Sequence, residues 1–517
     1  MAEISKSSQF RFPGPLIWLF VTAILMGYVY MFGLGMPLLG PDEPRYSQVA
    51  REMFERGDWV TTTLGGHNWF EKPALLYWMQ IVSYGIFGVS EFAARLGSAL
   101  FGLGTVFALF LVGLKREGGY DVQSGRTPLP YWMMAVSATS LGLIVFSRGA
   151  SFDIIVTFPL TASLAGFYLW YLSSERNESV RKRAFFLFTF YFFSGVAVLA
   201  KGLIGIVFPA AIVGFFYLLR REFPKRDLLV SFLWGPLVAV LTASAWYLPA
   251  YLRHGWEFID EFFVQHHFQR FTSNKYKHPQ PFWFFWAIFP LMTIPWVPFF
   301  LAAVWKTGRR IVSELVSAFS RKEGPSSEKT DPLAVFAFAW LLVPLAFFSF
   351  SGSKLPGYVL PSVPAAAILT ALYVDRFAAV SKARDMLCKS LAIAMFVVCF
   401  LLLLLVVPRY ADDDSTKSLV KAADEAGYRD RKIAGYLGRN HNLEFYAAGR
   451  LYREEAGEQK AFTSVDELIS LARSTPDGKL LVVTQEWHLD ELKKDPGVRI
   501  REIARRGENA ILVVEAN

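Results

Sequence analysis

A series of long apolar segments is the feature that most constrains the fold of this chain. Segments long enough to cross a bilayer as helices lie at 15–38, 93–114, 129–147, 154–172, 184–200, 202–219, 228–250, 282–304, 333–350, 356–374 and 386–407. Apolar residues make up 53% of the 517 residues and charged residues only 19%, which is typical of membrane proteins. The sequence therefore predicts an all-α polytopic membrane protein with about 11–13 transmembrane helices.

Basic residues in the loops predict how these helices are oriented. They recur in every second loop, at Lys115 and Arg116, 181–183, 220–226, 309–322 and 376–384. Basic loops stay in the cytoplasm, so these loops and the N-terminus, with Lys6 and Arg11, are expected there. The net charge of +9 then reflects topology, and no nucleic-acid partner is expected.

Hydropathy falls sharply at Arg409, which divides the chain into a membrane domain, 1–408, and a soluble domain, 409–517. Strand-like runs at 432–437, 443–448, 479–484 and 510–515 alternate with helix-like runs at 465–473 and 489–494. This pattern predicts a small α/β domain. An odd number of membrane spans places it on the outer, periplasmic side.

Polar side chains at membrane depth are costly and usually functional, and in this chain they gather at the outer ends of the spans. The outer loops 40–92 and 251–281 contribute several of them, and short turns between spans contribute the rest. The set is Asp42, Glu43, Lys72, Asp153, Lys201, Arg270, Lys354 and Tyr358.

Carboxylates beside several cations suit a reaction that releases a phosphate. Lys72, Arg270 and Lys354 are positioned to neutralise a lipid phosphate, and Tyr358 to donate a hydrogen bond to it. Asp42 is a candidate general base, or an electrostatic partner for positive charge at an anomeric carbon.

Four motifs carry a resemblance to a known family: PDEPRYSQVAREMFERGDWV with FEKPALLYW, AKGLIG, HHFQRF and SKLPGYVLP. In this order they resemble the GT-C glycosyltransferases related to protein mannosyltransferases, in particular the lipid A aminoarabinose transferase group. The resemblance covers roughly residues 15–375. It implies a GT-C fold, a polyprenyl-phosphate sugar donor and an inverting transfer at the outer membrane face.

The same resemblance implies roles for individual residues. Asp42 and Asp153 would be the functional acidic pair, with Glu43 beside them. The substrate-binding residues would be Lys72, Arg270 and Tyr358 at the carrier phosphate, Arg45 and Tyr46 around the cavity, and Lys201 and Lys354 nearby.

The segment Gln265–His267 departs from the family pattern, because a doubled histidine stands where an acidic residue precedes a single one. Glu71 and His267 could together bind zinc. Only two ligands are visible, however, so a histidine that hydrogen-bonds a loop is the favoured interpretation, and no cofactor is expected to be required.

Three functions remain open at this stage. The favoured one is transfer of 4-amino-4-deoxy-L-arabinose to lipid A in a bacterial inner membrane, by a monomer. The second is transfer of a hexose or mannose to a protein or another glycan. The third is a transporter or flippase for a lipid-linked sugar, which should show related halves and broken helices; the sequence contains no internal repeat.

Overall fold

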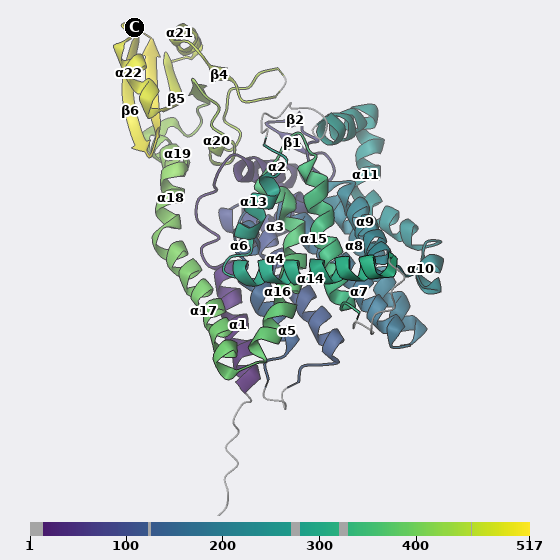
Figure 1. Cartoon of the computed structure of the whole chain (residues 1–517). Helices are drawn as coiled ribbons and strands as arrows, with labels where there is room; N and C mark the ends of the chain where they lie inside the picture. Colours follow the sequence, from purple (N-terminus) through teal and green to yellow (C-terminus); the bar gives the residue numbers. More distant parts are fainter. Residues whose placement is uncertain (1–13, 122–125, 270–279, 320–328, 456, 517) are drawn as a thin grey trace, which may run out of the picture.

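The computed structural model describes residues 14–121, 126–269, 280–319, 329–455 and 457–516, without the side chains of 266–269 and 318–319. Most of this chain is helical, and the helices form a bundle from which a small sheet domain projects at one end (Figure 1). The prediction of a helical membrane protein with a small α/β domain is therefore confirmed.

Eight helices within the described residues are long and apolar enough to cross a membrane. They are α1 (Gly14–Met31), α4 (Glu91–Glu117), α7 (Phe152–Glu175), α8 (Val180–Lys201), α11 (Gly235–Ile259) with its continuation η1 (Asp260–Gln269), α15 (Pro332–Ser349), η2 (Pro356–Ser362) with α16 (Val363–Ala378), and α17 (Lys382–Leu405). Two shorter apolar helices are α3 (Leu75–Phe87) and α9 (Ile204–Arg220). The short α10 (Arg226–Ser231) precedes α11.

Two predicted spans, 129–147 and 282–304, are interrupted. The segment 129–147 forms α5 (Leu129–Ala138) and α6 (Leu141–Ser147), bent by 58°. The indole N–H of Trp296 donates to the Thr139 hydroxyl (2.8 Å), and the Leu141 N–H donates to the Ile294 carbonyl (2.9 Å), so protein groups fill this break.

The expectation of one span at 282–304 is wrong, because the structure forms two helices there, α13 (Phe284–Met292) and α14 (Val297–Phe319). Pro290 and Pro295 lack the N–H that a continuous helix needs. Helix α14 lies across its neighbours (Figure 1). Its exposed residues combine Lys306, Arg309 and Arg310 with Leu301, Trp305 and Val312, a mixture that is typical of a helix at a membrane surface.

The two ends of the bundle differ in character. One end carries the amphipathic helix α2 (Asp42–Arg56), the hairpin of β1 (Thr63–Leu64) and β2 (His67–Asn68), and the sheet domain (Figure 1). The basic loops are joined by ion pairs elsewhere, including Arg116 with Asp331 (2.6 Å) and Arg183 with Asp227 (3.1 Å). Helix α2 begins directly after Pro41, so the first polar residues of the outer loop lie at its N-terminus.

The soluble part contains a five-stranded sheet in the order β4-β3-β5-β7-β6. Its strands are β3 (Ile433–Tyr436), β4 (Ala461–Phe462), β5 (Lys479–Gln485), β6 (Val498–Arg506) and β7 (Asn509–Ala516). Strands β4, β3 and β5 are parallel, and β5, β7 and β6 are antiparallel. The helices are α18 (Val407–Asp414), α19 (Lys417–Ala423) with η3 (Asp424–Tyr428), α20 (Asn442–Tyr446), α21 (Val465–Ser474) and α22 (Glu486–Lys494).

The strand predicted at 443–448 is wrong, because this segment forms the helix α20. Leu443, Glu444 and Phe445 are all buried, since α20 is enclosed between the sheet and α2. Alternating apolar residues cannot distinguish a short strand from a short helix that is buried on every side.

Helix α20 attaches the soluble part to the outer loop. The Leu38 N–H donates to the Tyr446 hydroxyl (2.7 Å), and this hydroxyl donates to Glu91 (3.2 Å). Lys417 forms an ion pair with the same carboxylate (2.6 Å). Leu38 precedes α2 and Glu91 begins α4, so the soluble part is bonded to both ends of the first outer loop.

Candidate functional site

Asp42 is the first residue of α2 and faces outward from the bundle. Its side chain is 49% exposed and pairs with Arg45 one turn later. The Arg45 Nε donates to the Pro41 carbonyl (3.1 Å), which fixes the guanidinium beside the turn. A carboxylate is stabilised at a helix N-terminus, and the exposure of the Asp42 side chain leaves it accessible to a ligand.

Glu43 has a different environment. It accepts from Arg95 at 2.6 and 3.0 Å and from the N–H groups of Leu39 (2.8 Å) and Ala150 (2.6 Å). Only 4% of the Arg95 side chain and 12% of the Glu43 side chain are exposed. This buried pair therefore joins α4, the start of α2 and the turn before α7.

Arg95 also holds the chain that precedes Asp42. Its guanidinium donates to the carbonyls of Leu34 (3.0 Å), Met36 (2.6 Å) and Pro37 (2.9 Å). We did not predict this role for Arg95 from the sequence. The available signal was a guanidinium inside a predicted span, since such a charge is tolerated only with partners.

Glu71 and Lys72 form a second acidic–basic pair beside α2. They are bonded to each other, and each side chain is 11% exposed. Burial opposes the charge of Arg45, but Glu71 and Asp42 raise the pKa of its guanidinium above the usual value. The two carboxylates and the two cations of Asp42, Arg45, Glu71 and Lys72 thus belong to one electrostatic cluster.

Asp153 lies in the first turn of α7 and forms an ion pair with Lys201 at the end of α8. The Lys201 ammonium also lies 5.0 Å from the centre of the Tyr358 ring, a cation–π contact. A Cβ at Gly357 would stand 1.9 Å from the Asp153 Oδ2, so only glycine permits this approach of η2. The start of α7, the AKGLIG motif with Lys201 and the SKLPGYVLP motif with Gly357 and Tyr358 therefore meet at the Asp153 carboxylate.

Aromatic rings connect the two groups. Phe152, next to Asp153, packs edge-on against Tyr46 (4.9 Å) and Tyr77 (5.4 Å). Burial, together with Asp42 and Glu71, holds the pKa of Tyr46 well above its usual range. The sequence-predicted residues of the first outer loop, α7, α8 and η2 are thus brought to one region.

The remaining predicted residues contribute in other ways or are not described. Lys354 is buried, and its ammonium donates to the carbonyls of Ser351 (2.7 Å) and Gln280 (3.0 Å). Arg270 and the His267 side chain lie outside the described residues. Among those that are described, no three His, Cys, Asp or Glu side chains are grouped as a metal site would require.

Comparison with known proteins places the chain in a family. The model of the dolichyl-phosphate-mannose-protein mannosyltransferase family matches residues 37–304, which is just over half of the chain. The chain belongs to this family.

Individual sequence relatives give a more specific comparison than the family model. The chain is 30% identical over 358 residues to an undecaprenyl phosphate-alpha-4-amino-4-deoxy-L-arabinose arabinosyl transferase of Yersinia enterocolitica, covering 68% of this chain and 58% of the relative. A protein of the same name from Aeromonas salmonicida is 31% identical over 350 residues, covering 66% and 56%. The matches thus span less than two thirds of these relatives' length.

Solved structures share the fold. A crystal structure of ArnT from Cupriavidus metallidurans bound to undecaprenyl phosphate has a TM-score of 0.74 at 22% identity, covering 96% of this chain and 98% of that one. The archaeal oligosaccharyltransferase AglB from Archaeoglobus fulgidus has a TM-score of 0.53 at 12% identity, covering 92% and 70%. The first match includes the soluble sheet region, so the whole architecture recurs in that protein.

Proposed function

We propose that this protein is an integral-membrane glycosyltransferase that takes a sugar from a polyprenyl-phosphate donor at the outer face of a bacterial inner membrane. The observation that carries the proposal is that two ion pairs, Asp42 with Arg45 and Asp153 with Lys201, lie in one region, because the neighbouring residues Tyr46 and Phe152 pack ring against ring. Membership of a sugar-transferring family supports the same reaction.

The proposed reaction is an inverting displacement. An acceptor oxygen attacks the anomeric carbon, the bond from that carbon to the phosphate oxygen breaks, and the electron pair leaves with the polyprenyl phosphate. Asp42, which is the more exposed carboxylate, takes the acceptor proton. Asp153 stabilises positive charge at the anomeric carbon and is itself held by Lys201.

The departing phosphate needs compensating donors in a site partly removed from water. We assign Lys72, Lys201 and the Tyr358 hydroxyl to it, and retain Arg270 as a further candidate. Lys354 instead stabilises the turn before η2 through the two carbonyls that its ammonium contacts. For Glu43 we propose a positioning role, because Arg95 and two backbone N–H groups occupy its oxygens.

The favoured donor sugar is 4-amino-4-deoxy-L-arabinose, in keeping with the names of the Yersinia and Aeromonas relatives. The favoured acceptor is lipid A, which is the acceptor that the motif resemblance implies. We further propose that residues 1–408 form the membrane enzyme, with the N-terminus cytoplasmic, and that 409–517 form its periplasmic part. Transfer of another sugar to a protein or glycan, and transport of a lipid-linked sugar, are the alternatives.

A transfer assay distinguishes these possibilities. Purified protein in detergent is given radiolabelled undecaprenyl-phosphate aminoarabinose with lipid A, and in parallel undecaprenyl-phosphate mannose. Labelled lipid A is expected only with the first donor, and Asp42→Asn should abolish it. Absence of product with either donor would contradict the enzyme proposal, because a transporter performs no chemistry in detergent.

A further inference from the structure

A polar pocket of about 260 Å³ lies where the sheet domain meets the segment leading into α2. Gly40 and Pro41 form one wall, directly before Asp42. The opposite wall comes from the ends of β3 and β5 and from the turn before β7. Parallel strands β3 and β5 both present their carboxyl ends here, the position where open α/β sheets bind ligands. Neither Asp42 nor Asp153 lines this pocket.

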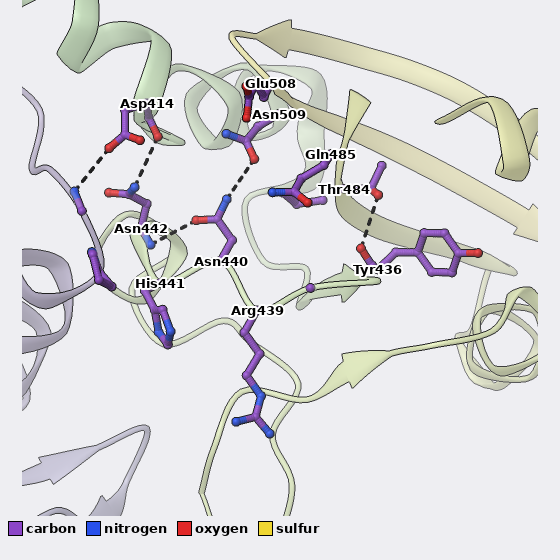
Figure 2. Close-up of a pocket in the computed structure, with 14 residues that line it drawn as sticks. Asp414, Tyr436, Arg439, Asn440, His441, Asn442, Thr484, Gln485, Glu508 and Asn509 are labelled. Atoms are coloured by element: carbon purple, nitrogen blue, oxygen red, sulfur yellow. Dashed lines mark hydrogen bonds between the residues drawn. The ribbon is translucent and has the colours of Figure 1, made fainter. Parts of the chain in front are cut away.

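Amide side chains dominate its lining. Asn440 donates to the Asn509 side chain (3.1 Å) and accepts from the Asn442 N–H (3.1 Å), while the Asn442 amide donates to the Asp414 carbonyl (3.3 Å) (Figure 2). Gln485 lies between Asn509 and Thr484 in the same view (Figure 2). A carboxamide both donates and accepts hydrogen bonds, and so does the hydroxyl of a sugar.

Two buried side-chain polar atoms in this lining have no hydrogen-bond partner among the described residues. They are the Asn442 Oδ1, in a side chain of a residue only 7% exposed, and the His441 Nδ1. A buried polar atom without a partner is costly. A ligand carrying several hydroxyl or amino hydrogens suits the Asn442 oxygen, whereas a phosphate dianion brings mainly further acceptors.

The charges of the pocket lining also favour a ligand that is not an anion. Asp414 and Glu508 contribute two carboxylates. Arg439, the guanidinium of the lining, is already paired with Glu454 (3.2 Å) and Glu458. Burial, with Arg45 nearby, lowers the pKa of His441 to about 4, so its ring is neutral at physiological pH. The pocket is thus unfavourable for an anion and suitable for a neutral or cationic group.

We propose that this pocket is a carbohydrate-binding site for a neutral or amino sugar unit, held beside the reaction centre. The volume of about 260 Å³ accommodates one monosaccharide rather than an extended glycan. The proposal rests on the proposed function in one respect only: the bound unit belongs to the acceptor, whose neighbouring part reaches Asp42 across the Gly40–Pro41 wall. Acceptor recognition is thereby assigned to the sheet domain.

Saturation-transfer NMR on the full-length protein in nanodiscs tests the site directly. D-glucosamine and D-glucose are the probes, and inorganic phosphate, followed by ³¹P line broadening, is the comparison. We expect saturation transfer to both sugars and no phosphate broadening from this pocket. Gln485→Ala and Glu508→Ala should each weaken sugar binding about three- to tenfold or more, since each removes one hydrogen-bonding group.

Glu491→Ala is the matched control, because Glu491 is an exposed carboxylate on α22 outside the pocket lining. It should bind the sugars like the parent. Sugar binding that is absent from the parent, or unchanged in both pocket variants, would overturn the proposal, as would phosphate broadening that Glu508→Ala alters.

Transfer kinetics separate this proposal from the proposed function. Gln485→Ala should raise the KM for the acceptor while the affinity for undecaprenyl phosphate stays at the parental value. Transfer by a parent protein that binds no sugar in the pocket would refute the pocket alone. Sugar binding that depends on Gln485, in a protein that transfers nothing, would refute the glycosyltransferase and leave the pocket.

Discussion

Asp42 and Glu43 are adjacent carboxylates, and we predict that their removal has opposite consequences. Glu43→Gln should destabilise the fold, whereas Asp42→Asn should leave the fold intact and abolish transfer. The difference follows from their surroundings, since the Asp42 side chain is 49% exposed and the Glu43 side chain is 12% exposed beside a nearly inaccessible Arg95.

The magnitudes follow from burial. Glu43→Gln leaves the Arg95 charge buried without its counter-ion, and it turns an amide NH₂ toward a donor of Arg95 and the N–H of either Leu39 or Ala150. Loss of one partner of a buried pair costs about 3–5 kcal/mol. Asp42→Asn breaks a half-exposed contact with Arg45, which is worth about 0–1 kcal/mol. Loss of a general base should nevertheless reduce turnover by about a hundredfold or more.

Unfolding by SDS titration in mixed micelles, followed by tryptophan fluorescence, measures stability, and labelled product measures turnover. Both variants are purified and assayed together with the parent. The reasoning fails if Glu43→Gln unfolds within about 1 kcal/mol of the parent. It also fails if Asp42→Asn keeps near-parental turnover, or if it loses stability as Glu43→Gln does.

Three further predictions concern other parts of the chain. Asp153→Asn and Lys201→Gln should each lower turnover. The double variant should lose less turnover than the product of the two single fold-losses, with a coupling of about 0.5–3 kcal/mol in the transfer rate. Strictly multiplicative losses would show that the ion pair does not act as a unit. The pKa of His441 is lowered to about 4 by burial, so the unfolded chain binds a proton before the folded one does as the pH falls from about 6.5. The free energy of unfolding should therefore decrease as the pH falls from about 6.5 to about 4. His441→Gln should reduce this dependence of stability on pH, as measured by thermal unfolding scans at several pH values. Cysteine introduced at Ser474 should react with an impermeant maleimide in intact spheroplasts and cysteine at Ser179 should not, both positions being exposed; the reverse pattern would invert the topology.

Hydropathy was sufficient to predict the membrane class and most of the spanning helices, because each span depends on local apolar length. It failed at 282–304, where Pro290 and Pro295 divide an apolar run into α13 and α14. It also failed at 443–448, where contact with α2 decides between strand and helix. Both failures concern segments whose conformation depends on prolines or on distant partners rather than on local pattern.

Residue types and motif positions were sufficient to locate Asp42, Glu71, Lys72, Asp153, Lys201 and Tyr358 at one end of the molecule. They could not assign partners. The sequence does not show that Glu43 faces Arg95 from 52 residues away, or that Lys354 donates to backbone carbonyls. The polar pocket was missed altogether, because its walls come from Gly40, from the end of β3 and from β5.

The attachment of α20 to Leu38 and Glu91 has a consequence for how the two proposed functions of this chain can change during evolution. The family match ends at residue 304, and of the pocket lining it includes only Gly40 and Pro41, whereas the residues on the sheet-domain side lie between 414 and 509. Under the proposed role of the pocket in acceptor binding, substitutions on its sheet-domain side would alter which acceptor is bound and leave Asp153 and Lys201 untouched. Acceptor specificity and the transfer reaction could therefore evolve separately within one polypeptide. The two parts are joined where the Tyr446 hydroxyl accepts from the Leu38 N–H, shortly before Asp42.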